Sequence, residues 1–206
     1  MNRCVARPCV WTLPSCHKTL FVDNFNTDDE SARQAAFQLI KDAAQRADNI
    51  GVDEFPAEWF DVLLQYVDVS VLLYKPHEEQ THHQRLAGLI VVTQSRFSRI
   101  AHPRACQLFI FTAVELSGRQ VRRDLVRLGI ALAAESERRY MDCFVEVFVP
   151  CLEHVLAMRD EGFVITACIP HAGILVGHQE HVDSYIMYKQ LDTFHTQGVS
   201  TCTLAV

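Results

Sequence analysis

The segment from Gln107 to Phe163 constrains the fold most, because it predicts a strand, a helix, a second strand and a second helix in one uninterrupted run. The first strand, Cys106–Glu115, is dense in aromatic and β-branched residues and carries no charge before its last position, which is typical of burial on both faces. A helix with an apolar stripe through Leu125 and Leu132 follows. This alternation favours an α/β fold.

The second half of the run repeats the order. Cys143–Val149 is a predicted strand, Pro150–Glu161 a short helix, and Phe163 opens the next strand. Gly162 stands between helix and strand, where a residue with positive φ commonly ends a helix.

The turn between the first strand and its helix has the layout of a phosphate site. Arg119 lies five residues beyond Val114, and Arg122 and Arg123 follow within the first helical turn. Amides at a helix start lack partners within the helix and, with the helix dipole, attract phosphate. We expect the chain to reverse near position 120, so that these amides and guanidinium groups converge on a diphosphate. The alternative is an exposed helix start without a ligand.

At this point the residues resemble the Gcn5-related N-acetyltransferase (GNAT) superfamily, whose members transfer an acetyl group from acetyl-CoA to an amine. Three places carry the resemblance. Arg119–Asp124 matches in position the family's Arg/Gln-x-x-Gly-x-Gly/Ala turn, Cys151–Phe163 fits the register of the helix that ends in Gly-Phe, and Val182–Leu191 is similar to the closing strand.

The resemblance implies an α/β (α+β) fold of three layers, in which a mixed, mostly antiparallel twisted sheet is flanked by helices. The family's fourth and fifth strands splay apart, and the pantetheine arm of the cofactor enters that gap. The resemblance covers a single GNAT-like domain over 18–191. We expect a loose N-terminal tail over 1–17, where Pro8 and Pro14 disfavour a regular helix, and a C-terminal tail over 192–206.

The remaining elements follow from local patterns. We expect a first strand over Lys18–Asp23, helices over 31–47 and 56–67, and a hairpin of Val69–Tyr74 with Leu86–Thr93 joined by a polar loop.

The function implied is that of an acetyl-CoA-dependent N-acyltransferase, in which a primary amine of a small amine, an amino acid or a protein attacks the thioester directly. The residues implied in cofactor binding are Thr112, Val114, Arg119, Gln120, Val121, Arg122, Arg123 and Asp124. Glu115 and His154 are the candidate general bases. The alternatives are a solvated strand end for Glu115 and a half-buried helix position for His154.

Several family positions hold other residues here. Arg122 and Asp124 stand where the turn has glycines, Met158 stands at the tyrosine that often protonates the thiolate, and Leu108 stands at the strand carboxylate of histone-type members. Cys151 replaces the motif asparagine and is a thiol nucleophile, a proton donor or, as is usual for a lone cysteine without a base, inert. An alternative function is therefore a catalytically silent GNAT-fold interaction module with a degenerate CoA site.

Composition is that of one folded domain: 206 residues, 49% hydrophobic and 21% charged. A net charge of -6 gives no global reason to bind nucleic acid, and no apolar run predicts a membrane span. Eight cysteines without a Cys-x-x-Cys pair indicate free thiols in a reducing compartment, so we expect the cytoplasm, with the nucleus or mitochondrion left open.

A zinc site is the competing interpretation of one segment. Cys168 and His171, then His178 and His181, have spacings that can ligate zinc. Turn-forming residues surround them, so we favour loop histidines without a metal.

Overall fold

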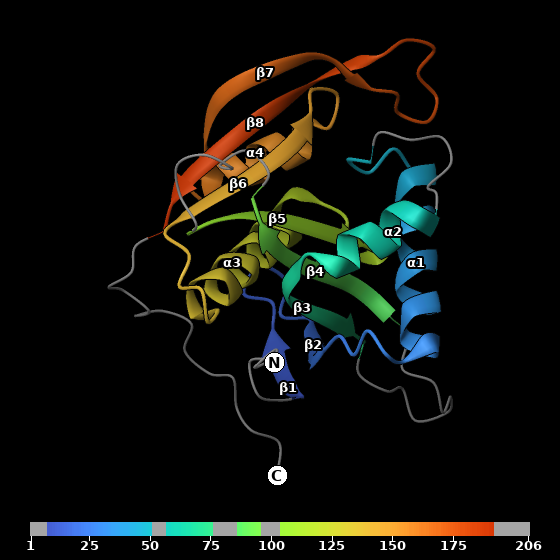
Figure 1. The fold of residues 1–206 in the computed structure, drawn as a ribbon, viewed down its shortest axis with the longest axis vertical. Helices are drawn as coiled ribbons and strands as arrows, with labels where there is room; N and C mark the ends of the chain where they lie inside the picture. Colours follow the sequence, from blue (N-terminus) through green and yellow to red (C-terminus); the bar gives the residue numbers. More distant parts are fainter. Residues whose placement is uncertain (1–7, 51–56, 76–85, 96–103, 192–206) are drawn as a thin grey trace.

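The computed structural model describes residues 8–50, 57–75, 86–95 and 104–191. Within this part, every strand joins one eight-stranded sheet in the order β1-β2-β3-β4-β5-β6-β8-β7 (Figure 1). The strands are β1 (Cys9–Thr12), β2 (Thr19–Asn24), β3 (Val67–Tyr74), β4 (Leu86–Gln94), β5 (Ala105–Thr112), β6 (Asp142–Phe148), β7 (Val164–Gly173) and β8 (Val182–Gln190).

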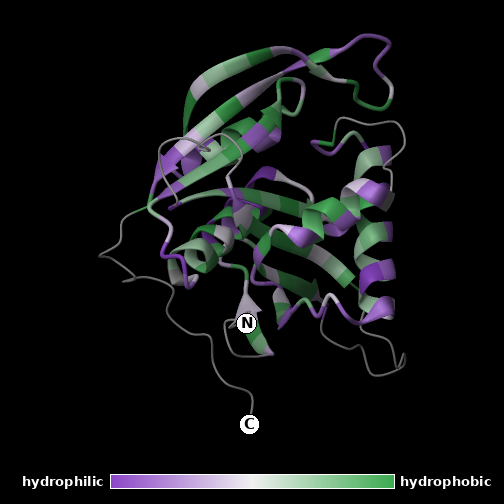
Figure 2. Ribbon diagram, in the orientation of Figure 1, coloured by the Kyte–Doolittle hydropathy of each residue, from purple (hydrophilic) through white to green (hydrophobic). Residues whose placement is uncertain are grey.

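Helices cover both faces of the sheet. They are α1 (Glu30–Gln45), α2 (Ala57–Gln65), α3 (Arg119–Glu135) and α4 (Leu152–Asp160), with a 3-10 turn, η2 (Val114–Leu116), before α3. One hydrophobic core lies under α1 and α2, and another lies under α3 and α4. Hydrophobic residues fill the central strands, whereas α1 mixes hydrophilic and hydrophobic positions as expected of a surface helix (Figure 2).

All neighbouring strands pair antiparallel except β5 and β6, which are parallel. The crossover between these two strands is α3, as the strand-helix-strand pattern predicted. The predicted fold class, a three-layer arrangement around a mixed and mostly antiparallel sheet, is confirmed.

Most predicted elements are present with ends shifted by a few residues. The predicted hairpin is the antiparallel pair β3 and β4. Asp29 caps α1 by accepting hydrogen bonds from the amides of Ser31 and Ala32. Gly162 ends α4 with a φ of 85°. The expected polar loop at 76–85 and the C-terminal tail at 192–206 lie outside the described residues.

The structure differs from the expected loose tail at residues 9–12. These four residues form β1, which pairs with β2 from Cys9 opposite Val22 to Thr12 opposite Thr19. The turn that follows buries Leu13 completely in the core beneath α3 and α4. The segment is short and bracketed by prolines, so its local pattern is weak, and pairing with the edge of the sheet decides its conformation.

Candidate functional site

The parallel pair β5 and β6 opens into a fork. Only three residue pairs align, from Ala105 with Asp142 to Gln107 with Phe144, although both strands continue for several residues. Beyond this point, neither strand supplies the other with backbone partners. The splay expected between the family's fourth and fifth strands is therefore present. These two strands are β5 and β6 here because β1 precedes the first predicted strand.

The chain turns from β5 into α3 at Gly118. This residue has a φ of 112°, a conformation that favours glycine, and it occupies the N-cap position of α3 without a side-chain cap. Because Arg122 N–H bonds to the Gly118 carbonyl at 3.0 Å, the amides left without a helical partner are those of Arg119, Gln120 and Val121. The reversal thus occurs two residues before the position expected from the sequence, and 119–124 lie within the helix.

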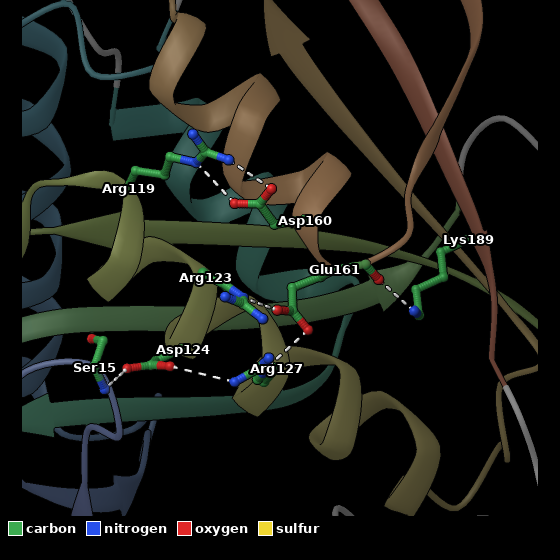
Figure 3. Close-up of polar contacts among 8 residues, drawn as sticks. All are labelled: Ser15, Arg119, Arg123, Asp124, Arg127, Asp160, Glu161 and Lys189. Atoms are coloured by element: carbon green, nitrogen blue, oxygen red, sulfur yellow. Dashed lines mark hydrogen bonds and ion pairs between the residues drawn. The ribbon is translucent and has the colours of Figure 1, made fainter.

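The guanidinium groups at this helix start are paired with carboxylates from the end of α4 (Figure 3). Arg119 binds Asp160 through two hydrogen bonds, at 2.8 and 2.7 Å, and Arg123 binds Glu161 at 2.6 Å. The hydrogen bond from Arg119 lowers the pKa of Asp160. Both arginines therefore lie beside the predicted phosphate site with their charges already neutralised.

Arg122 points elsewhere, into a buried polar cluster. Its Nη2 lies 2.5 Å from Asp48 and its Nη1 contacts the Nε2 atom of His154. Burial, together with the neighbouring Arg122 charge, lowers the pKa of His154 to about 3. Asp48 lies 3.3 Å from His154 and would favour an imidazolium, but its charge is taken up by Arg122, so the imidazole is neutral with Nε2 as acceptor.

A cavity of about 410 Å³ lies at the carboxyl ends of β5 and β6. Its walls come from the end of α1, from η2, from the start of α3 and α4, and from the loop before β8. The lining residues are Arg46, Ala47, Asp48, Val114, Ser117, Arg122, Pro150, Cys151, Leu152, Glu153, His154, Leu175 and His178.

The two candidate bases lie in different places. His154 is buried and lines the cavity. Glu115 lies outside that lining, where its carboxylate accepts a hydrogen bond from Lys75 at 2.8 Å and its carbonyl accepts one from Lys18 at 3.2 Å. Fold geometry therefore favours His154 over Glu115 for contact with a bound substrate.

The remaining candidates are distributed around the same corner. Val114 is exposed and lines the cavity, whereas Thr112 is buried and its carbonyl accepts a hydrogen bond from Arg46 at 2.6 Å. Asp124 is buried within α3 and accepts a hydrogen bond from Ser15 N–H at 2.8 Å, so it holds the turn after β1 and does not cap the helix (Figure 3). Leu108 packs against α3 in the core.

The candidate zinc ligands do not converge. Among the described residues, no three His, Cys, Asp or Glu side chains gather as a metal would require. Cys168 and His171 lie exposed on β7, and the cysteines that the structure describes are all free thiols.

In the described ranges, no helix combines the length and the apolar character of a membrane-spanning segment.

Sequence reasoning missed the acidic partners Asp48, Asp160 and Glu161. A signal existed for the last two, because carboxylates at a helix C-terminus oppose the helix dipole and so indicate a nearby cation. Nothing local marks Asp48, whose partner Arg122 is 74 residues away in the chain.

No protein-family model and no curated protein matches the chain by sequence. Solved structures do match its fold. A GNAT superfamily phosphinothricin acetyltransferase from Sinorhizobium meliloti in complex with acetyl-CoA aligns with a TM-score of 0.64 at 14% identity, over 90% of this chain and 97% of that one. A Gcn5-related N-acetyltransferase from Kribbella flavida aligns with a TM-score of 0.63 at 14% identity, over 84% and 98% of the two chains.

A third similar structure is the spermidine N-acetyltransferase from Vibrio cholerae in complex with CoA and spermine, with a TM-score of 0.58 at 15% identity, over 84% of this chain and 95% of that one. The chain therefore has the GNAT fold, as the resemblance implied. The likeness extends over nearly the full length of each similar structure.

Proposed function

We propose that this chain is an acetyl-CoA-dependent N-acyltransferase that transfers an acetyl group to a primary amine. The observation that carries the proposal is the meeting of two features at one corner: the uncapped N-terminus of α3 and the cavity beyond the splayed ends of β5 and β6. Similar structures hold acetyl-CoA or CoA, which supports this co-substrate.

The residues at this corner fit the phosphates of acetyl-CoA through the main chain. The free amides of Arg119, Gln120 and Val121 are donors at the positive end of the helix dipole. The adjacent Arg119 and Arg123 would add guanidinium donors. Asp160 and Glu161 already bind these groups and would compete with the phosphates for them.

Acetyl-CoA supplies an activated thioester carbonyl, and the chain must place an amine against it. Positioning and donors for the developing oxyanion provide much of the rate in such a transfer. Backbone groups of Thr112, the last residue of β5, and Val114, the first residue of η2, are the proposed contacts of the pantetheine arm. His154 lines the cavity, but its acceptor Nε2 contacts Arg122 and its pKa is about 3, so it would be a weak base that must release Arg122 before it takes a proton from the amine.

Two measurements on the full chain test the proposal. Calorimetric titration should detect acetyl-CoA binding, and thiol release should accompany turnover with at least one member of a panel of polyamines, amino acids, lysine peptides and protein N-termini. A matched reaction without amine controls for hydrolysis. Absence of binding at millimolar acetyl-CoA would contradict the proposal. The melting temperature is an independent check, because a ligand that binds the folded chain raises it.

A second candidate function is a catalytically silent interaction module. It is favoured by the charge pairing at the site, where Asp160, Glu161 and Asp48 neutralise Arg119, Arg123 and Arg122 and leave little free positive charge for a cofactor with several phosphates. This candidate predicts neither acetyl-CoA binding nor thiol release with any amine. Binding without turnover would indicate a chain that keeps the cofactor site and has lost the chemistry.

A further inference from the structure

The four residues after α1, Arg46 to Asn49, contact both arms of the fork; we call them the bridging segment. Arg46 donates a hydrogen bond from Nη2 to the carbonyl of Thr112, the last residue of β5, at 2.6 Å. Asn49 contacts β6 with both ends of its side-chain amide. Its Nδ2 donates to the Glu146 carbonyl at 3.0 Å, and its Oδ1 accepts from Phe148 N–H at 2.8 Å.

These contacts use the backbone groups that face the fork. The amide of Ala113 bonds to the carbonyl of Ala87 in β4 at 2.8 Å, so the carbonyl of the preceding Thr112 points to the opposite side, away from β4. On β6, the side-chain amide of Asn49 bonds to the carbonyl of Glu146 and to the N–H of Phe148, two residues further on. A residue of a parallel neighbouring strand would make the same two hydrogen bonds. The side chain of Asn49 thus replaces the strand pairing that β5 no longer provides.

Further contacts hold the bridging segment in place. Asp48 is paired with the buried Arg122, and the carbonyl of Ala47 accepts a hydrogen bond from the Cys151 thiol at 3.5 Å. Ala47 and Asn49 have φ angles of 53° and 62°, in the left-handed region. At Ala47 this conformation ends α1, because Asp48 N–H bonds to the Ala43 carbonyl and Ala47 N–H bonds to the Ala44 carbonyl, both at 2.9 Å, and asparagine adopts it readily at position 49.

We propose that the bridging segment is an internal competitor of acyl-CoA, and that it must leave the fork before the pantetheine arm enters. This inference rests on the proposed function. The pantetheine arm carries two amide groups, which offer the same donors and acceptors as a peptide, and the free edges of β5 and β6 are where such groups would pair. In the structure, Arg46 and Asn49 hold these edge groups, and the same segment forms one wall of the cavity.

Loss of the bridge should therefore strengthen cofactor binding. Asn49→Ala removes both hydrogen bonds to β6, and we expect the Kd for CoA to fall by about tenfold, since the binding-competent state becomes more populated. Arg46→Ala should change the Kd in the same direction. Gln38→Ala is the matched control, because this residue is exposed on α1 and its side-chain amide bonds to Asp42 of the same helix, so its Kd should equal that of the wild type. Calorimetric titration with CoA measures all four proteins.

A second readout needs no cofactor. Opening of the bridging segment uncovers the Cys151 thiol, so Asn49→Ala should increase its rate of alkylation by iodoacetamide several-fold, measured by peptide mass spectrometry. The exposed Cys168 on β7 is the internal reference and should react equally in both proteins. If Asn49→Ala does not fold, Asn49→Asp keeps the acceptor for Phe148 N–H, loses the donor to Glu146, and takes its place in both measurements.

The outcomes separate the two proposals. If the wild type binds CoA and both bridge variants bind it equally or more weakly, the bridging segment is no competitor, and the proposed function stands. An unchanged Cys151 alkylation rate also overturns the inference. If the wild type and every variant fail to bind CoA, the proposed function and the inference are both wrong.

Discussion

The guanidinium of Arg119, the first residue of α3, and the carboxylate of Asp160, the last residue of α4, form a two-bonded ion pair. Asp160→Asn removes the negative charge beside the proposed phosphate site and frees Arg119. We expect CoA to bind roughly threefold to tenfold more tightly at low salt, with a smaller gain at high salt because the charges are screened. Arg119→Ala should have the opposite effect.

Glu137→Gln is the control for this prediction, because it makes the same charge change on an exposed residue beyond the other end of α3. Titrations at two salt concentrations compare the variants. If Asp160→Asn and the control bind CoA with equal affinity, Arg119 does not contact the phosphates of CoA.

The buried ion pair of Asp48 and Arg122 predicts a large loss of stability on truncation. Asp48→Asn leaves the Arg122 charge buried without its carboxylate, and we expect the free energy of unfolding to fall by about 3 kcal/mol. Asp61→Asn breaks the exposed pair with Arg33 and should cost less than about 1 kcal/mol. Urea denaturation measures both, and equal losses would contradict the buried character of the first pair.

His154 predicts a pH dependence of stability. Its pKa is about 3 in the folded chain, below the ordinary value of 6.5, so the unfolded chain binds the proton more tightly. This contribution is fully present above pH 6.5 and is lost as the pH falls toward 3. Between pH 6 and pH 4, we expect the wild type to lose about 1 kcal/mol per pH unit more than His154→Gln.

Denaturation curves of both proteins at several pH values measure this difference, and the other titrating groups cancel because the two proteins share them. Parallel pH profiles for the wild type and His154→Gln would show that His154 is not held neutral by its surroundings.

Gly129 marks a close approach between α3 and β5. A Cβ atom built there would lie 2.6 Å from the Cδ1 atom of Leu108, so Gly129→Ala should lower the free energy of unfolding by about 1–3 kcal/mol despite the better helix propensity of alanine. In a Leu108→Ala background, the same substitution should cost less. If the two substitutions change the free energy of unfolding additively, the added Cβ atom at position 129 does not clash with Leu108.

Much of the fold follows from local pattern. The dense apolar run of β5, the helical stripe of α3 and the glycine that ends α4 each predict one element, because strand and helix periods and a positive φ depend on residues near in sequence. The strand β1 escaped prediction because four residues have little intrinsic preference and depend on pairing with β2.

The candidate site could be predicted only in part. The positions of Val114, the arginines and His154 come from spacing along the chain, and the structure places them around one corner of the sheet. Their charges could not be predicted, because the carboxylates that neutralise Arg119 and Arg122 lie 41 and 74 residues away. Likewise, the bridge from Asn49 to β6 spans almost one hundred residues.

The amino-acid sequence by itself determined the order of strands and helices and the placement of a helix start after β5, because these depend on backbone preferences over a few residues. Only the tertiary structure decided where the helix dipole is left uncapped, which arginines are paired, and which segment bonds to the open edges of β5 and β6. The physical reason is that hydrogen bonds and ion pairs depend on distance in space, and chain folding sets that distance between residues that are remote in sequence.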